Sequence, residues 1–478
     1  MLNTEWVYLL TMSLEKLAAL LHGRILVGSD ARRIPLSVSR IGGTPAAALT
    51  FLKRPYVSEQ GLLTRLQHHQ VRCLVVQAPH RFSLSKWRRA GICIIQVPNL
   101  SHAYLTLARY YSRKYPLPRT QVIGSSGKTT TKEMIGAVLQ EKFNTLTGRQ
   151  NLNNPLGVAY NLLCLNETHQ TAVIEAGMKG SGVMRLASRL IRPDIGVLTS
   201  IHSAHLASFG SIGKIIAAKA EILEYLSPRG TFIINWSDPN CRRFPLHRFQ
   251  GKVVRYGFTP DCDLWASDIQ RQDFRTIFTV NTMDLQFPCA INIIGRYNVG
   301  NALAAIAVGL EQGLVPEEIV RGLERFQPVD GRLKVYQSMS GAMIIDDNFN
   351  ANPDSTRLLV DELITMAQEK PVVLVLGDME RPSHNITKYA RRVHYRIGQQ
   401  LAKGDFQHVL AVGYWAKEYL RGAIKAGFPR EKISYFPSVQ AARSLFNKLL
   451  TPGTIAVLKA SPYTEVKQLR MKSSVQPL

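Results

Sequence analysis

The chain has 478 residues, and its composition of 45% hydrophobic and 19% charged residues is that of a globular protein. At roughly 100–200 residues per domain, this length predicts several domains. No apolar run approaches the roughly 20 residues that a membrane-spanning helix needs. Charged residues near the start, such as Glu5, Glu15 and Lys16, are not typical of a signal peptide. The sequence therefore predicts a protein without a membrane span.

The formal net charge of +25 is unusually basic. Such a charge suits nucleic acid, a membrane surface or an anionic substrate. The basic residues are dispersed, and no basic tail or nucleic-acid motif is present. We therefore expect a small anionic substrate rather than nucleic acid.

The six cysteines are scattered along the chain without a CxxC pair. This distribution favours reduced thiols over a disulfide framework or a zinc site. We therefore expect a cytoplasmic protein, and we expect it to be a monomer.

The first unit, residues 1–117, alternates short apolar runs with helical patterns, which predicts a small α/β domain. The predicted strands are residues 24–27, 73–76 and 92–97, and the predicted helices are residues 13–21 and 104–111. Residues 113–119 contain two prolines and three basic residues and are interpreted as a linker.

The second unit, residues 118–326, alternates more regularly. Strands that alternate with helices predict a parallel sheet covered by helices on both faces, with ligands at the carboxyl ends of the strands. The predicted strands end at Ile123, Ile174, Leu198 and Ile234, and the predicted helices are residues 132–140, 181–190 and 212–225.

The third unit, residues 327–478, begins around Pro328 and repeats this alternation. It predicts a second open α/β domain of the Rossmann type. Its predicted strands are residues 343–345, 372–376, 409–412 and 455–458.

A glycine-rich turn follows the first strand of the second unit and leads into an amphipathic helical pattern. Backbone N–H groups of such a turn and the positive end of the helix face an anion. Lys128 can reach the outer phosphates of a nucleotide, and the Thr129 hydroxyl can ligate Mg²⁺. The strict eight-residue pattern is incomplete because Val122 replaces its first glycine, so an ordinary strand–helix turn is the alternative. The phosphate-binding candidates are Gly124, Ser125, Ser126, Gly127, Lys128, Thr129 and Thr130.

Three further residues are candidates by position. Glu175 ends an apolar run, where an acid can hold Mg²⁺ or simply cap a helix. His205 lies just past the next strand, where a single histidine is more often structural. Lys219 lies in a helical pattern, where a lysine is normally a solvated side chain.

A series of motifs in fixed order resembles the Mur ligases, the ATP-dependent amide-forming enzymes of peptidoglycan synthesis. The DDNFNANP string is most similar to members that add a D-alanyl-D-alanine dipeptide to a UDP-muramyl tripeptide. The matching strings are GSSGKTTTK (124–132), NLNNPLG (151–157), RPDIG (192–196), AHL (204–206), AKAE (218–221), GRYNVGNA (295–302), DGR (330–332), DDNFNANP (346–353) and LGDM (376–379).

The resemblance implies a Mur ligase architecture of three domains, in which an acyl phosphate forms from ATP and is attacked by an amine. It also implies roles for single residues. Lys128 and Thr129 would hold the γ-phosphate and Mg²⁺. The other implied roles are metal binding by Glu175 and His205, adenine binding by Asn298 and Asn301, closure on ATP by Arg332 and Asp347, and carbamylation of Lys219.

The chain departs from the family at both substrate-facing ends. The Asp-Ser-Arg motif of the N-terminal domain is absent from residues 37–44. Tyr297 replaces the usual histidine before Asn298, residues 459–462 read Lys-Ala-Ser-Pro instead of Lys-Gly-Ser-Arg, and residues 380–382 read Glu-Arg-Pro instead of Glu-Leu-Gly. Three hypotheses follow: the cell-wall ligase with a UDP-linked muramyl peptide, a paralogue joining another carboxylate and amine, and a nucleotide-binding partner protein without turnover.

Overall fold

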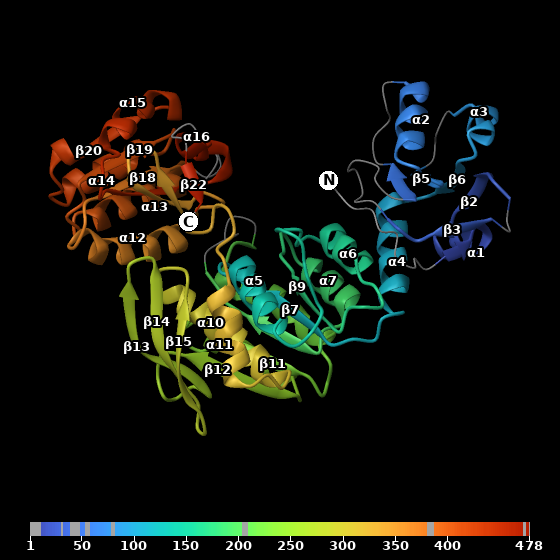
Figure 1. The fold of residues 1–478 in the computed structure, drawn as a ribbon, viewed down its shortest axis with the longest axis horizontal. Helices are drawn as coiled ribbons and strands as arrows, with labels where there is room; N and C mark the ends of the chain where they lie inside the picture. The colour runs from blue at the N-terminus through green and yellow to red at the C-terminus, as the bar shows by residue number, and fades with distance from the viewer. Residues whose placement is uncertain are drawn as a thin grey trace.

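The computed structural model describes residues 11–29, 32–38, 48–52, 58–77, 82–202, 209–379, 387–471 and 475–477. Three lobes follow one another along the chain, with the central lobe between the N-terminal and C-terminal ones (Figure 1). In the described ranges, no helix is long and apolar enough to cross a membrane. The six cysteines are free, and all except Cys164 are buried.

The N-terminal lobe contains a four-stranded sheet with the order β2-β6-β5-β4. The three predicted strands are confirmed, whereas β4 and the separate antiparallel pair of β1 and β3 were not predicted. The strands are β1 (Thr11–Ser13), β2 (Arg24–Val27), β3 (Arg33–Pro35), β4 (Leu49–Leu52), β5 (Cys73–Gln77) and β6 (Cys93–Val97). The helices are α1 (Leu14–Leu20), α2 (Glu59–His68), α3 (Leu84–Arg89) and α4 (Leu100–Ser112).

The central lobe is built on a nine-stranded sheet with the order β15-β14-β13-β12-β11-β10-β7-β9-β8. Neighbouring residues of β7 enter different cores, since Val122 packs with α5 and α10 while Ile123 packs with α6 and α7. Helices therefore cover both faces, as predicted. The strands are β7 (Arg119–Ile123), β8 (Thr145–Thr147), β9 (Thr171–Glu175), β10 (Ile195–Leu198), β11 (Thr231–Asn235), β12 (Lys252–Gly257), β13 (Leu264–Gln272), β14 (Arg275–Asn281) and β15 (Gln286–Ile291). The helices are α5 (Lys128–Leu139), α6 (Pro155–Leu163), α7 (Val183–Ile191), α9 (Ile212–Ala220), the 3₁₀ turn η1 (Glu221–Glu224), α10 (Arg296–Glu311) and α11 (Pro316–Arg325).

The predicted parallel sheet is confirmed from β8 to β13, whereas the antiparallel extension formed by β13, β14 and β15 was not predicted. Side chains along β13 and β14 alternate between more buried and more exposed positions. This period of two is typical of antiparallel strands that bury one face, and such strands need no crossover helix. Figure 1 shows the extension reaching toward α12 (Pro353–Ala367) of the C-terminal lobe.

The C-terminal lobe contains a seven-stranded sheet with the order β20-β19-β18-β21-β17-β16-β22. All four predicted strands are confirmed, while β20 and the antiparallel strands β16 and β22 were not predicted. The strands are β16 (Lys334–Ser338), β17 (Met343–Asp347), β18 (Val372–Gly377), β19 (His408–Val412), β20 (Ile433–Phe436), β21 (Ile455–Lys459) and β22 (Val475–Pro477). The remaining helices are α13 (Thr387–Leu401), α14 (Lys417–Lys425), α15 (Val439–Leu449) and α16 (Lys467–Met471).

The lobes are joined by packing and by charged contacts as well as by the chain. The predicted linker is fastened by its last residue, because the Arg119 guanidinium donates to the carbonyls of Ser112, Tyr115 and Ile191 at 2.6, 2.9 and 2.9 Å. The extension contacts the C-terminal lobe through an ion pair of Lys370 with Asp273 at 2.9 Å. The Arg119 contacts thus fix the N-terminal lobe to the central one, and the ion pair fixes the C-terminal lobe to the extension.

Candidate functional site

The glycine-rich turn between β7 and α5 has a backbone that only glycine adopts easily. Gly124 and Gly127 have φ values of 152° and 82°. A Cβ atom on Gly124 would lie 2.0 Å from Thr199 Oγ1, and one on Gly127 would lie 2.5 Å from Asn301 Oδ1. Both glycines are therefore required by conformation and by space, and the turn ends at the N-terminus of α5.

Two residues directly after the neighbouring strand β10 hold this turn in place through hydrogen bonds. The N–H of Ser125 donates to the carbonyl of Ser200 at 2.8 Å, and the N–H of Ser126 donates to Ser200 Oγ at 3.0 Å. The Thr199 hydroxyl donates to the carbonyl of Ser126 at 2.6 Å. The turn is thus preorganised by residues that follow the next strand of the parallel sheet.

Lys128 is the first residue of α5 and is half-buried beside the turn. Its ammonium donates to the carbonyl of Ser125 at 3.2 Å. The pKa of Lys128 lies below its usual value, mainly because burial disfavours the charged form. The Glu175 carboxylate partly offsets this effect, and Arg332 adds to it. The geometry places an ammonium at the mouth of an anion-binding turn.

Thr129 and Glu175 meet at the carboxyl edge of the sheet. The Thr129 hydroxyl donates to Glu175 Oε2 at 2.7 Å, and Asn153 Nδ2 donates to Glu175 Oε1 at 2.7 Å. Glu175 is only 3% exposed. A hydroxyl and a carboxylate side by side form an oxygen donor set of the kind that Mg²⁺ prefers, so these residues fit the ion.

Two side chains of the C-terminal lobe reach the same turn. Arg332 donates to Thr129 Oγ1 at 3.3 Å and stacks on the Phe349 ring with its guanidinium carbon 4.0 Å from the ring centre. Its Nε is buried and has no hydrogen-bond partner within the described chain. Asn352 donates to Ser126 Oγ at 3.4 Å. A buried N–H without a partner, on a side chain that contacts the turn, fits an arriving anion.

Residues 122–309 match the Mur ligase middle domain, and residues 331–461 match the Mur ligase glutamate ligase domain. A UDP-N-acetylmuramoyl-tripeptide–D-alanyl-D-alanine ligase of Synechocystis is 30% identical over 359 residues, 75% of this chain and 75% of that protein. The chain belongs to the Mur ligase family. The ligase of the same name from Bacillus subtilis is 29% identical over 376 residues, 79% of this chain and 80% of that protein. A crystal structure of MurF from Acinetobacter baumannii, 26% identical, superposes with a TM-score of 0.83 over 97% of this chain and 99% of that chain.

As a Mur ligase, the chain is an enzyme of the ligase class. The hypothesis of a partner protein without turnover is therefore wrong. The full-length superposition includes both lobes in which the sequence departs from the family motifs. The divergence thus affects residues within a complete Mur ligase fold.

Two residues predicted to lie near adenine, Asn298 and Asn301, are buried at the start of α10. Asn298 Nδ2 donates to the Ile294 carbonyl at 2.7 Å, and Asn301 Nδ2 donates to Asn298 Oδ1 at 2.9 Å. Thr131 of α5 donates to Asn301 Oδ1 at 3.0 Å. Through Asn301, the pair therefore packs against the phosphate-binding turn and the first turn of α5. That the pair lies near adenine stays a prediction.

Asp347 lies at the end of β17 and pairs with Lys459 at the end of β21, with 2.6 Å between Lys459 Nζ and Asp347 Oδ2. Burial raises the pKa of Asp347, while Lys459 and Arg332 lower it. The first residue of the altered Lys-Ala-Ser-Pro string is thus engaged with a predicted nucleotide-binding residue. The role of Asp347 toward ATP stays a prediction.

Lys219 is 1% exposed within α9. Burial and the nearby Lys128 hold the pKa of Lys219 well below its usual value, and Cys241 raises it. No carboxylate of the described residues forms an ion pair with this lysine. Such surroundings disfavour the charged ammonium form of Lys219.

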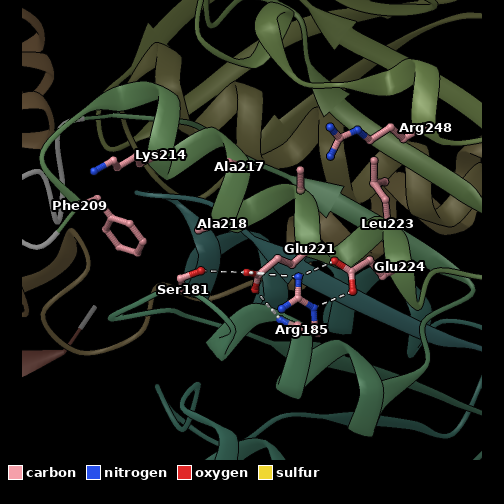
Figure 2. A pocket seen from close by; sticks show the side chains of 11 residues that line it. Ser181, Arg185, Phe209, Lys214, Ala217, Ala218, Glu221, Leu223, Glu224 and Arg248 are labelled. Atoms are coloured by element: carbon pink, nitrogen blue, oxygen red, sulfur yellow. Dashed lines mark hydrogen bonds and ion pairs between the residues drawn. The ribbon is translucent and has the colours of Figure 1, made fainter.

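A cavity of about 440 Å³ is lined in part by α9, the helix that carries Lys219 (Figure 2). Figure 2 shows Arg185 between two acids, and it donates to both carboxylate oxygens of Glu224 at 2.7 and 2.8 Å. Glu221 accepts from the N–H groups of Gly182 and Arg185 at 2.8 and 2.9 Å, so it fastens the start of α7 to η1. The cavity is lined by Ser181, Arg185, Phe209, Lys214, Ala217, Ala218, Ala220, Glu221, Leu223, Glu224 and Arg248. The side chains of Glu221, Glu224 and Arg185 thus bind groups of the protein itself. Because Glu221 ends α9, these bonds fix the end of the helix that carries Lys219.

His205, predicted as a metal ligand, lies outside the described residues. Within the described ranges, no group of three or more His, Cys, Asp or Glu side chains could hold a metal ion. Asn153 and Asn352 were not predicted as site residues, although both lie in motifs that match the family, at residues 151–157 and 346–353. Their proximity to the site follows from loop paths that a motif does not reveal.

Proposed function

We propose that this Mur ligase uses ATP to join D-alanyl-D-alanine to a UDP-N-acetylmuramoyl tripeptide in peptidoglycan synthesis, acting as a cytoplasmic monomer. The single observation that supports this most is the whole-length similarity to MurF from Acinetobacter baumannii, which includes both outer lobes. The contacts of Arg332 and Asn352 with the phosphate-binding turn support it independently.

The chemistry follows from the poor reactivity of a carboxylate toward an amine. One carboxylate oxygen attacks the γ-phosphorus of ATP, ADP leaves, and an acyl phosphate forms. The neutral amine of the dipeptide then attacks the acyl carbon, phosphate leaves with the C–O bond electrons, and the amine proton passes to solvent. Lys128 and Arg332 would neutralise the transferring phosphoryl group and position it, which is the main task in this chemistry.

We further propose that Thr129 and Glu175 hold Mg²⁺. Their oxygens fit the ion, as the hydroxyl–carboxylate contact at 2.7 Å indicates. When bound, Mg²⁺ would supply charge neutralisation for the phosphate oxygens. His205 belongs to the same proposed set, on the resemblance of its motif alone.

We expect Lys219 to be carbamylated in the active enzyme. The neutral amine attacks the carbon of CO₂ and loses a proton, which replaces a disfavoured cation by an anion near Lys128. With ¹³C-bicarbonate, a carbamate resonance should appear by NMR, and depletion of bicarbonate should lower turnover reversibly. Lys219→Arg should abolish the resonance, and Lys214→Arg, on the exposed side of α9, should keep it. A wild-type enzyme without this resonance would contradict the proposal.

The decisive assay is ADP release with UDP-N-acetylmuramoyl tripeptide and D-alanyl-D-alanine, compared with a panel of other amines. The proposed function predicts the highest kcat/KM for this pair. Release that occurs only with another carboxylate or amine would support the second candidate, a paralogue with different substrates. That candidate is favoured by the absence of Asp-Ser-Arg from residues 37–44.

A binding titration separates the same two functions without turnover. We expect UDP-N-acetylmuramoyl tripeptide to bind at both low and physiological salt, with other residues of the N-terminal lobe replacing the missing motif. The net charge of +25 could hold a diphosphate nonspecifically, but salt would screen such attraction. Binding that disappears at physiological salt while ATP still binds would favour the paralogue, because a site that lacks its polar contacts loses most of its preference.

A further inference from the structure

Lys132 is a lysine of α5 that is completely buried. Its ammonium donates to the carbonyls of Gly148 and Gln150, the latter at 2.9 Å, and it pairs with Glu133 Oε1 at 2.7 Å. A buried ammonium is costly unless every donor has a partner. Two of its three partners belong to one short segment, residues 148–153, that follows β8.

This segment, called here the 148–153 loop, leads directly to the metal-binding candidates. The Asn153 carbonyl accepts from the N–H of Gly177 at 2.8 Å, and Asn153 Nδ2 donates to Glu175 Oε1. Gln150 has a φ of 47°, a left-handed conformation that costs free energy for a residue with a side chain. The loop therefore adopts a strained path that external contacts must stabilise.

The contacts form a continuous chain from α5 to the site. Lys132 fixes the loop, the loop places Asn153, and Asn153 occupies one oxygen of Glu175. The other oxygen of Glu175 then faces Thr129. Without the Asn153 amide, the Glu175 carboxylate could rotate, and either of its two oxygens could then face Thr129.

We propose that Lys132 is a positioning residue that orients Glu175 for Mg²⁺ through the 148–153 loop and Asn153. The inference rests on the metal–nucleotide part of the proposed function and not on the identity of its substrates. Neither Lys132 nor Asn153 touches the transferring phosphoryl group in this role. Their effect is on the affinity of the site for the ion, as is typical of residues that hydrogen-bond to metal ligands.

The test measures Mn²⁺ binding by electron paramagnetic resonance in the presence of a non-hydrolysable ATP analogue. Lys132→Met keeps an unbranched side chain, shorter by the terminal atom, and removes the charge. We expect it to weaken Mn²⁺ binding about tenfold or more, the usual effect of losing such a partner. Asn153→Ala should weaken binding similarly, and the double variant should be no weaker than the weaker single variant, because both changes break the same chain of contacts.

Lys142→Met is the matched control. Lys142 follows α5 and also donates to a carbonyl, that of Gly313 at 2.6 Å, but it is exposed and this contact does not lead to Glu175. It should leave Mn²⁺ binding unchanged. In turnover assays, excess Mg²⁺ should restore part of the activity of Lys132→Met, which a role confined to folding would not produce.

The outcomes separate the inference from the proposed function. A wild-type protein that binds no Mn²⁺ with the nucleotide analogue would overturn both. Normal Mn²⁺ binding by folded Lys132→Met, with a wild-type circular dichroism spectrum, would overturn the inference alone. If Lys132→Met does not fold, Asn153→Ala decides, since wild-type affinity in that variant would break the proposed chain.

Discussion

Lys128→Ala is expected to lower ATP-dependent ADP release by roughly a hundredfold or more while leaving the fold intact. Lys128 lies at the first position of α5, and its ammonium rests on the carbonyl of Ser125 at the mouth of the turn. Its removal takes a positive charge from the transferring phosphoryl group, where that charge acts in a partly buried site.

Circular dichroism and thermal unfolding would verify the fold of Lys128→Ala, since its side chain makes a single hydrogen bond within the described residues. Lys142→Ala, just beyond the other end of α5, is the control and should keep wild-type turnover. Near-normal ADP release by folded Lys128→Ala would contradict the assignment of this turn to phosphate binding.

The sequence predicted the contacts that depend on strand order. Thr129 and Glu175 end or follow two strands of one parallel sheet, and β7 and β9 are neighbours in it. Carboxyl ends of neighbouring parallel strands lie at the same edge. Their 2.7 Å contact therefore follows from topology that alternating patterns reveal.

Features that depend on loop paths or on burial of charge could not be predicted in this way. Lys132 falls in a helical pattern where a lysine is normally solvated, yet it is completely buried because a loop folds over it. Asn153 was recognised only as part of a motif, since its contact with Glu175 needs the left-handed turn at Gln150. The antiparallel extension is not predicted because the alternation of β13 and β14 between buried and exposed positions is irregular and weaker than the neighbouring βα pattern.

Asn298 and Asn301 show a further limit of motif-based interpretation. The resemblance implies that they sit near the adenine, which stays a prediction, and the structure adds that their amides bond to Ile294, to each other and to Thr131. A motif records that residues occur together and not which of their atoms remain free for a ligand. Burial and hydrogen bonding supply that information.

Arg332→Lys is expected to lower ADP release almost as strongly as Arg332→Ala, which should cost roughly a hundredfold. The guanidinium makes two contacts at once, stacking on Phe349 and donating to Thr129 across the boundary between the lobes. A lysine keeps the charge but has neither the planar group for stacking nor the fixed arrangement of donors. Its ammonium would therefore bind phosphate without linking the C-terminal lobe to the turn.

In the two Arg332 variants, we expect ATP binding and turnover to change by different amounts. Arg332 belongs to the closing lobe, so we expect affinity for a non-hydrolysable ATP analogue to fall less than kcat, because an interaction needed mainly in the transition state lowers kcat. Arg325→Ala is the matched control, since Arg325 is 72% exposed and pairs with Glu141 on the far end of α5. Wild-type kcat in Arg332→Lys would show that charge alone suffices. The contact between the lobes would then be a consequence of packing and not a requirement for phosphoryl transfer.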